Sequence, residues 1–460
     1  MIGDWTLQHV VKATEATFED SIDLSTRITG ISTDTRQIKQ GDLFVCLCGE
    51  KFDAHDYLDQ AREKGAVAAI TEKEVDDALP QLKVQDTLIA LGRLATLNRN
   101  HFNGSVVAIT GSSGKTTVKE LLASMLKQQG PTLFTQGNLN NHIGAPLTLL
   151  KLKEEHQYAV IELGASAEGE IDYTVHLTQP HVAVLNNACE AHIEGFGSLQ
   201  GVVRAKSEIY NTLTDQGAGV VNLDDPHAAF WCEKLENMQR QYLTFSIQNN
   251  QADIWVSDAH VNPSGAWGFK LHFRDESIPV QLNLIGQHNI ANAAAATAAW
   301  VALGLPLSAV KSGLESCEAV KGRMKPIQLK SGWLIDDSYN ANPQAVEAAI
   351  DFLAERPAQR ILVLGDMAEL GPEAESLHAQ IGGYIAAAGI DLFFAVGPLM
   401  SNAVNTTLSA GINAKHFEQQ DRLIAELKQH LSEPFTLLVK GSRSAQMDRV
   451  VSALQQEETL

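Results

Sequence analysis

The sequence contains little cysteine, and its cysteines form no metal or redox motif. The five cysteines among 460 residues are Cys46, Cys48, Cys189, Cys232 and Cys317. Cys46 and Cys48 alternate along an expected strand, which places both on one face, and their spacing is not the CxxC of zinc and thiol-redox sites. An odd, scattered set is typical of reduced thiols that serve as small buried hydrophobic residues, which favours a cytoplasmic protein.

The sequence also lacks any segment that predicts export or membrane insertion. The N-terminus, MIGDWTLQHVVKATEA, has no cationic stretch followed by a long apolar one, so we expect no signal peptide. The longest apolar run, Ala293 to Leu305, is rich in alanine and too short to span a bilayer. We therefore expect a buried helix there and no stable membrane insertion.

Positive charge is scarce. The 35 Lys and Arg residues are outnumbered by 55 Asp and Glu, which gives a net charge of −20. Binding to nucleic acid requires clustered cations that neutralise phosphates, so this balance argues against a nucleic-acid partner. It does not exclude small phosphate substrates, because backbone N–H groups and a few cations can hold them locally.

What the sequence does contain predicts a multidomain α/β protein. A chain of 460 residues exceeds one ordinary core, and 44% hydrophobic with 20% charged residues is typical of globular α/β proteins. Short apolar runs that end in polar residues predict a parallel sheet covered on both faces, with ligands at the carboxyl ends of its strands. The alternating stretch from Ala252 to Leu284 predicts antiparallel strands instead. We expect a small N-terminal domain over 1–99, a central domain over 100–320 and a Rossmann-like domain over 321–460.

The motif with the clearest chemistry is AITGSSGKTT at 108–117, directly after the apolar run that ends at Ile109. A strand, a glycine-rich turn, a lysine and a hydroxyl before a helix are what a nucleoside triphosphate requires. Gly111 and Gly114 allow the backbone to approach phosphate, Lys115 offers a charge to the β- and γ-phosphates, and the Thr116 hydroxyl can hold Mg²⁺. The usual pattern has glycine at position 109, so the loop is a shortened GxxGKT form.

Three further residues of the central segment are candidates for catalysis. Glu162 ends an apolar strand and can reach the metal at the neighbouring loop, although an acid there can also simply cap the strand. His192 lies in a polar, glycine-bearing segment, and spacing alone leaves it between a structural and a functional role. Lys206, in VVRAKSEIY, lies at the expected start of a helix, where spacing alone favours an exposed helical lysine over a functional one.

Residues able to bind a base, a ribose or a phosphate occur later in the chain. Asn289 can offer an amide to an adenine edge, Arg323 can meet phosphate, Asp337 can accept from ribose hydroxyls, and Lys440 is a further candidate cation. Each residue alone is weak evidence for a nucleotide site. A turn, for example, explains the stretch DDSYNANP at 336–343 almost as well as nucleotide binding does.

Taken together, these segments resemble the Mur ligase family, the ATP-dependent amide-forming enzymes of bacterial cell-wall precursor synthesis. The similarity extends over essentially the whole chain, and the shortened loop is that family's form. The stretches that carry it are STDTR (32–36), GDLFVCLCGEKFDAHDY (41–57), TQGNLNNHIGAPLTLL (135–150), IELGASAEGEI (161–171), AHIEGFGS (191–198), DDSYNANP and GDMAELG.

The resemblance implies a three-domain α/β fold and a role for each matching residue. The N-terminal domain is implied to hold the UDP end of a substrate through Thr35 and Arg36. Mg²⁺ is implied to bind Thr116 and Glu162, with His192 at a second Mg²⁺. The phosphates of ATP are implied to lie against Gly111, Ser112, Ser113, Gly114, Lys115, Thr116 and Thr117.

The remaining implied roles concern the substrates and the third domain. Lys206 matches a lysine that several relatives carry as a carbamate, which turns a cation into a metal-binding anion. Asn138 and Asn141 are implied to face substrate or phosphates, and His142 departs from the acid or other polar residue common there. Asn289, Arg323 and Asp337 are implied to complete the nucleotide site.

The implied activity is an amide ligation through an acyl phosphate, with ATP and Mg²⁺ as cofactors. Within the family, GNLNNHIGAP and AHIEGFGS are most similar to members that add D-alanyl-D-alanine to UDP-N-acetylmuramoyl-tripeptide (UDP-MurNAc-tripeptide). Alternatives are addition of another amino acid, folyl polyglutamate extension, or, in a different class, a regulatory phosphate-loop NTPase. We expect a monomer.

Overall fold

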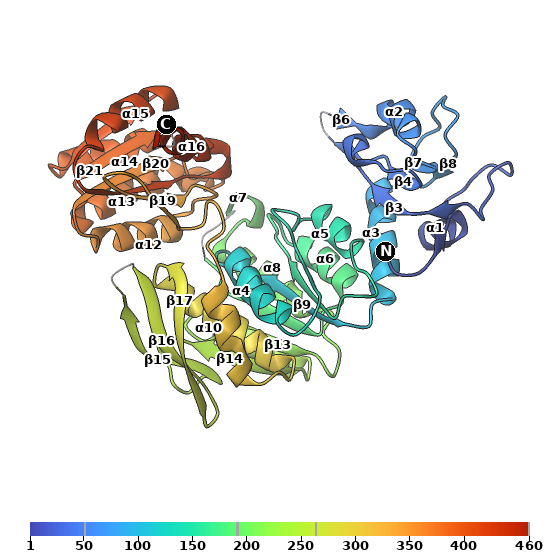
Figure 1. The fold of residues 1–460 in the computed structure, drawn as a ribbon, viewed down its shortest axis with the longest axis horizontal. Helices are drawn as coiled ribbons and strands as arrows, with labels where there is room; N and C mark the ends of the chain where they lie inside the picture. Colours follow the sequence, from blue (N-terminus) through green and yellow to red (C-terminus); the bar gives the residue numbers. More distant parts are fainter. Residues whose placement is uncertain (50–51, 190–192, 263–264, 459–460) are drawn as a thin grey trace.

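The computed structural model describes residues 1–49, 52–189, 193–262 and 265–458. The chain forms three α/β domains in sequence order, and the central domain lies between the other two (Figure 1). The predicted fold class is confirmed. Within the described residues, no helix combines the length and the apolar character needed to cross a membrane.

The N-terminal domain is built on a small parallel sheet with the strand order β3-β4-β7-β8. Two short antiparallel ribbons, β1–β2 and β5–β6, flank it. Its strands are β1 (Trp5–Thr6), β2 (Arg27–Ile28), β3 (Gly30–Ser32), β4 (Asp42–Val45), β5 (Cys48–Gly49), β6 (Phe52–Asp53), β7 (Ala68–Thr71) and β8 (Gln81–Lys83), and its helices are α1 (Leu7–Thr14), α2 (Leu58–Glu63) and α3 (Thr87–Asn100).

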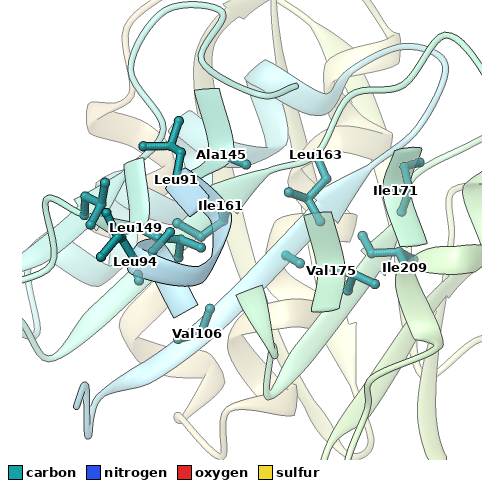
Figure 2. Close-up of a cluster of buried hydrophobic side chains, with 14 of the residues drawn as sticks. Leu91, Leu94, Val106, Ala145, Leu149, Ile161, Leu163, Ile171, Val175 and Ile209 are labelled. Carbon is teal, nitrogen blue, oxygen red and sulfur yellow. The ribbon is translucent and has the colours of Figure 1, made fainter. Parts of the chain in front are cut away.

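Helix α3 joins this domain to the next one. The Asp86 side chain caps it by accepting a hydrogen bond from the Ile89 N–H at 2.8 Å. Leu91 and Leu94 on α3 pack with apolar side chains of the central domain in one continuous core (Figure 2). The strand of the phosphate loop therefore starts from a fixed position.

The predicted arrangement of Cys46 and Cys48 is wrong. Strand β4 ends at Val45, and the Leu47 carbonyl accepts from the Ala54 N–H as the chain turns into the β5–β6 ribbon. Cys46 is buried and Cys48 is exposed, so the two thiols share no face and Cys48 is not a core residue.

The central domain contains a sheet with the order β10-β11-β9-β12-β13-β14-β15-β16-β17. Pairing is parallel from β10 to β15 and antiparallel from β15 to β17, as the alternating pattern predicted. The alanine-rich run lies in α10, which is buried as expected. The strands are β9 (Ser105–Thr110), β10 (Thr132–Phe134), β11 (Tyr158–Glu162), β12 (Val182–Leu185), β13 (Ala218–Asn222), β14 (Gln241–Ser246), β15 (Ile254–Val261), β16 (Ala266–Phe273) and β17 (Glu276–Ile285). The helices are α4 (Lys115–Lys127), α5 (Gly144–Leu149), α6 (Glu170–Thr178), α7 (Ile193–Phe196), α8 (Leu199–Ser207), α9 (Ala228–Asn237), α10 (His288–Ala302) and α11 (Val310–Ser316).

The third domain has the strand order β18-β19-β23-β20-β21-β22, parallel except for the β18–β19 pair. Its strands are β18 (Lys325–Gln328), β19 (Gly332–Asp337), β20 (Gln359–Gly365), β21 (Leu392–Val396), β22 (Asn413–Phe417) and β23 (Phe435–Lys440). Its helices are α12 (Pro343–Ala354), α13 (Ala374–Ala388), α14 (Met400–Ser409), α15 (Gln420–Leu427) and α16 (Asp448–Glu458).

Candidate active site

The central sheet brings three polar strand ends together. Strand β9 lies between β11 and β12. The connection after β9 runs to β10 on one side, and the connection after β11 runs past β9 to β12 on the other side. Parallel sheets bind ligands where the direction of the connections reverses in this way. In this register Glu162 of β11 pairs with Ile109 of β9, and Leu185 of β12 pairs with Thr110. The phosphate loop, the Glu162 carboxylate and the segment that starts at Asn186 therefore meet at one edge.

The phosphate loop has the backbone geometry that its glycines predict. Gly114 has a φ of +76° directly before α4, and a Cβ atom there would lie 2.3 Å from the Asn292 Oδ1. The Lys115 ammonium donates to the Gly111 carbonyl at 2.6 Å. Burial lowers the pKa of Lys115, the Glu162 charge opposes this effect, and the Arg323 charge adds to it. The lysine is thus held over the loop, and its contact with phosphate stays a prediction.

Glu162 has the environment of a metal ligand. Its side chain is 2% exposed, and Oε1 accepts a hydrogen bond from Asn140 Nδ2 at 2.7 Å. Oε2 is buried without a hydrogen-bond partner among the described residues. An unpartnered buried carboxylate oxygen is costly unless a cation binds it, so this residue fits the predicted Mg²⁺ site.

Thr116 contacts the segment that enters the third domain. Its hydroxyl oxygen accepts a hydrogen bond from Arg323 Nη2 at 3.1 Å. The Arg323 guanidinium also lies over the Tyr339 ring, 4.1 Å from its centroid. The structure therefore brings two predicted nucleotide-site residues together across two domains.

Lys206 is a buried amine with little to stabilise its charge. It lies on α8 and is 2% exposed, and its Nζ makes a long contact of 3.5 Å to the Ala165 carbonyl and lies 5.2 Å from the centroid of the Phe196 ring. Burial, with a smaller contribution from the Lys115 charge, lowers the pKa of Lys206 to about 7. The interpretation as an exposed helical lysine is wrong. His192, the other uncertain candidate, lies outside the described residues.

The predicted base and ribose residues are already engaged by protein groups. Asn289 Nδ2 donates to the Ile285 carbonyl at 2.7 Å, and Asn289 lines a small pocket with Thr117 and Arg323. Asp337 accepts from Lys440 Nζ at 2.7 Å in a buried ion pair. This pairing follows from the register, because Asp337 and Lys440 end the adjacent strands β19 and β23. A ribose contact by Asp337 stays a prediction.

The predicted substrate residues differ in their surroundings. Asn138 is exposed, whereas the Asn141 Oδ1 accepts from the Gly144 N–H at 2.8 Å and so shapes the turn before α5. Arg36 forms a two-point ion pair with Asp34, and this guanidinium lowers the pKa of Asp34 to about 2. Thr35 and Arg36 follow β3 of the N-terminal domain, and β3 lies apart from α4, which the phosphate loop precedes (Figure 1).

Several polar residues that shape the site were not singled out from the sequence. Asn140 contacts Glu162, and Asn187 Oδ1 accepts from the Ser113 N–H at 2.9 Å. Asp225 accepts from the Ala188 N–H at 2.8 Å and fixes the segment that leads toward His192. Their position after apolar strands was a signal for a ligand-binding edge, but it did not indicate which asparagine faces the site.

A second cluster of potential metal ligands lies in the N-terminal domain but is better explained as structure. Cys48, Asp53 and His55 place their ligand atoms within 4.8 Å of one another. His55 Nε2 accepts from the Glu72 N–H at 3.0 Å, so the ring proton sits on Nδ1, which lies 2.6 Å from Asp53 Oδ1. Asp53 also pairs with Lys73 at 2.7 Å. The proton and the lysine occupy the positions that a cation would need.

Three family models match the chain in the order of its domains. They are described as "Mur ligase family, catalytic domain" over 27–99, "Mur ligase middle domain" over 109–300, and "Mur ligase, glutamate ligase domain" over 322–443. The chain is 47% identical over 435 residues to the UDP-N-acetylmuramoyl-tripeptide–D-alanyl-D-alanine ligase of Escherichia coli K12, covering 94% of this chain and 95% of the relative.

Solved structures give the same picture for the whole fold. A crystal structure of MurF from Acinetobacter baumannii matches with a TM-score of 0.92 at 38% identity, covering 99% of both chains. The MurF ligase of Thermotoga maritima in complex with ADP matches with a TM-score of 0.82 at 27% identity, covering 94% of this chain and 98% of that one. Similarity therefore extends through all three domains.

Proposed function

The chain belongs to the Mur ligase family, and from this premise we propose that it joins D-alanyl-D-alanine to the terminal carboxylate of UDP-MurNAc-tripeptide in peptidoglycan synthesis. The reaction is ATP-dependent and forms ADP and phosphate. The observation that carries this proposal is the meeting of Lys115, Glu162 and the buried Lys206 at the edge where β9, β11 and β12 end, in a chain that matches this ligase throughout.

The first step activates the carboxylate. A tripeptide carboxylate oxygen attacks the γ-phosphorus of ATP, the bond to the bridging oxygen breaks, and ADP leaves an acyl phosphate behind. Two anions must approach each other, so cations are needed between them. Lys115 supplies one such charge, and Arg323 supplies another from the third domain.

The metal part of the site is assigned to side chains with suitable oxygens. Thr116 Oγ1 and Glu162 Oε2 would hold Mg²⁺, which supplies charge neutralisation at the phosphates, and His192 is proposed for a second ion. The unpartnered Glu162 oxygen supports this assignment. Lys206, with its pKa near 7, has a neutral amine that can add CO₂, and the carbamate would add a further anionic ligand.

The second step forms the amide. The D-alanyl-D-alanine amine attacks the acyl carbon, a tetrahedral intermediate collapses, and phosphate leaves while the amine proton passes to a base. Water would hydrolyse the acyl phosphate, so we propose that the third domain closes over the central one during the reaction. Asn289 and Asp337 then complete the site for the nucleotide.

The remaining assignments concern the long substrate and its setting. Thr35 and Arg36 are proposed to hold the UDP end, and Asn138 to contact substrate near the phosphates. The boundaries at residues 99 and 320 are proposed to separate three domains that act within one monomer. A cytoplasmic location belongs to the same proposal.

Phosphate release tests the function directly. We expect release to require UDP-MurNAc-tripeptide and D-alanyl-D-alanine together, with the pentapeptide product detected by mass spectrometry. L-alanine or D-glutamate in place of the dipeptide should give none, which separates the alternatives within the family. Dipeptide-independent release, or equal activity in Lys115→Ala, contradicts the proposal.

A further inference from the structure

We propose that a chain of asparagine amides couples recognition of the base to the shape of the phosphate loop, with Asn186 as the positioning residue at its centre. The inference rests on the proposed ATP site. Asn186 and Asn292 were assigned no role above, and through them the affinity of the loop for phosphates depends on whether a base is bound at Asn289.

The chain runs through three side chains in one direction. Asn289 Nδ2 donates to the Ile285 carbonyl at 2.7 Å, and Asn289 Oδ1 accepts from Asn292 Nδ2 at 2.9 Å. Asn292 Oδ1 then accepts from Asn186 Nδ2 at 3.1 Å. Asn186 Nδ2 also donates to the Ser113 carbonyl of the phosphate loop, again at 3.1 Å. An anchor in the β17–α10 turn is thereby connected to the loop.

The direction of each amide is fixed by its neighbour. The Ile285 carbonyl requires the NH₂ group of Asn289, which turns the oxygen of Asn289 toward Asn292. The same logic turns the oxygen of Asn292 toward Asn186. Asn186 lies against two acceptors, the Asn292 oxygen and the Ser113 carbonyl. Both can bond only to a donor, so both face its NH₂ group.

The orientation of the Asn186 amide costs free energy that a purely structural residue would avoid. It is 2% exposed, and its Oδ1 is buried without a hydrogen-bond partner among the described residues. Leaving a buried acceptor unpaired costs about 1–3 kcal/mol. Reversing the amide would set its oxygen against two other oxygens, so the cost is the consequence of holding Ser113 and Asn292 at once.

The amides touch the loop at the point where it is most sensitive to displacement. A Cβ atom on Gly114 would lie 2.3 Å from Asn292 Oδ1 and 2.4 Å from Asn186 Nδ2. The loop backbone is thus in contact with two members of the chain directly before α4. A shift of these amides must move the N–H groups that are proposed to bind phosphate.

The other end of the chain faces a small pocket, which this inference assigns to the edge of the base that meets Asn289. Asn289 lines it with Thr117 and Arg323. Nδ2 carries two hydrogens, and the Ile285 carbonyl takes one, so a purine ring nitrogen is a suitable acceptor for the other. A base bound there restrains Asn289, and through Asn292 and Asn186 it restrains Ser113. Phosphates then bind a loop whose ordering entropy is already lost, which gives positive coupling.

The experiment measures that coupling on the full chain without any turnover. Binding of tripolyphosphate is measured by calorimetry with and without saturating adenosine. We expect adenosine to increase the tripolyphosphate affinity of the unaltered protein about 5-fold or more, and tripolyphosphate to increase adenosine affinity by the same factor. In Asn186→Ala the factor should fall to about 1, and Asn292→Ala should behave alike.

Asn187→Ala is the matched control. Asn187 also holds Ser113, because its Oδ1 accepts from the Ser113 N–H at 2.9 Å and its Nδ2 donates to the Ser113 carbonyl at 3.2 Å, but within the described residues it makes no hydrogen bond to Asn292. Asn187→Ala should lower the affinity for tripolyphosphate by the same factor with and without adenosine. The coupling between adenosine and tripolyphosphate should therefore be unchanged. Asn186→Asp, nearly isosteric, serves if Asn186→Ala does not fold.

The outcomes separate this inference from the function on which it rests. A coupling factor retained in both Asn186 variants, or absent from the unaltered protein, overturns the inference while ATP binding and ligation stand. Failure of the unaltered protein to bind ATP at all overturns the proposed site first. Loss of coupling in Asn187→Ala as well would show that the loop responds to any loosening, which also contradicts a specific amide chain.

Discussion

Arg323 donates a hydrogen bond to the hydroxyl of Thr116, which lies 207 positions earlier in the chain, at 3.1 Å. The Gly322 N–H donates to Asp336 Oδ2 at 2.9 Å, which ties the arginine's segment to the third domain. Gly322 has a φ of +78°, and Met324 has a φ of +49°. The Arg323 guanidinium thus donates to the hydroxyl oxygen that is proposed to bind Mg²⁺. The segment that carries Arg323 is bonded to the third domain and should move with it.

This contact predicts that Arg323 matters both for domain arrangement and for catalysis. In Arg323→Ala the third domain should be less restrained without nucleotide, seen as a larger radius of gyration in small-angle scattering. The loss of a cation aimed at phosphate should lower kcat about 10²-fold or more. Arg323→Lys should recover only part of the rate, because an ammonium cannot reach Thr116 and cover the Tyr339 ring together.

Arg443→Ala is the control for this prediction. Its guanidinium lies 5.9 Å from the centroid of the same Tyr339 ring, but in the described part of the chain it makes no hydrogen bond to Thr116. We expect the scattering profile without nucleotide to be unchanged in this variant. If Arg323→Ala matches the unaltered protein within threefold in kcat, the role assigned to Arg323 is wrong.

The unpartnered oxygen of Glu162 predicts opposite effects on stability and on metal use. Glu162→Gln removes a buried charge whose Oε2 has no hydrogen-bond partner among the described residues, so the Tm measured by calorimetry should rise. The same change removes the proposed Mg²⁺ ligand, so the Mg²⁺ concentration for half-maximal phosphate release should increase at least tenfold. Glu155→Gln, in an exposed pair with Lys153 at 3.5 Å, should change neither quantity. A stabilised variant with an unaltered Mg²⁺ requirement would exclude Glu162 as a ligand.

The low pKa of Lys206, about 7, predicts a pH-dependent cost in stability. The ordinary lysine pKa is 10.5, so between pH 7 and 10.5 the unfolded chain binds more protons, and stability rises with pH across that window. The destabilisation caused by burying the charged Lys206 is therefore complete below pH 7 and disappears above pH 10.5. In CO₂-free buffer, Lys206→Met should raise the free energy of unfolding by about 1–4 kcal/mol at pH 6.5 and by much less near pH 10.

The same amine predicts activation by bicarbonate. Only the neutral form adds CO₂, so stimulation of ligation by bicarbonate should be strong at pH 8 and should fade as the pH decreases through 7. Lys206→Met should be inactive and insensitive to bicarbonate, although more stable. Carbon-13 NMR of protein kept in labelled bicarbonate should show a carbamate signal that the variant lacks. Activity that is independent of CO₂ at pH 8 would contradict the carbamate.

How much the sequence could predict depended on whether the determining interaction was local. The fold class followed from apolar runs and turn residues, and the phosphate loop followed from its own short motif. The position of Glu162 beside that loop was also predictable, because parallel strands end at one edge. Cys48 was misplaced because the turn after Val45 depends on a hydrogen bond between Leu47 and Ala54.

Side-chain partners across the fold could not be predicted in this way. Which asparagine of GNLNNHIG meets Glu162 depends on how the 135–143 segment crosses β11, and the sequence favoured Asn138 and Asn141 over Asn140. The Asp337–Lys440 pair depends on the register of two strands separated by 103 positions. The burial of Lys206 depends on what covers α8, which its helical spacing does not reveal.

Asn140 therefore provides the sharpest test of the site geometry. Its Nδ2 donates to Glu162 Oε1 at 2.7 Å, which fixes the carboxylate so that Oε2 is presented to a cation. Asn140→Ala should weaken Mg²⁺ binding about 10–100-fold, measured by calorimetry with ADP present, because the oriented ligand becomes free to rotate. Asn140→Asp should be worse, since two carboxylates then face each other.

The neighbouring asparagine separates orientation from local folding. Asn141→Ala removes the acceptor for the Gly144 N–H at 2.8 Å and should cost about 1 kcal/mol of stability, with Mg²⁺ affinity nearly unchanged. Asn140→Ala should show the reverse, a small stability change with a large loss of metal affinity. If both variants lose metal affinity in proportion to stability, the 135–143 segment acts as one folding unit and Asn140 has no orienting role of its own.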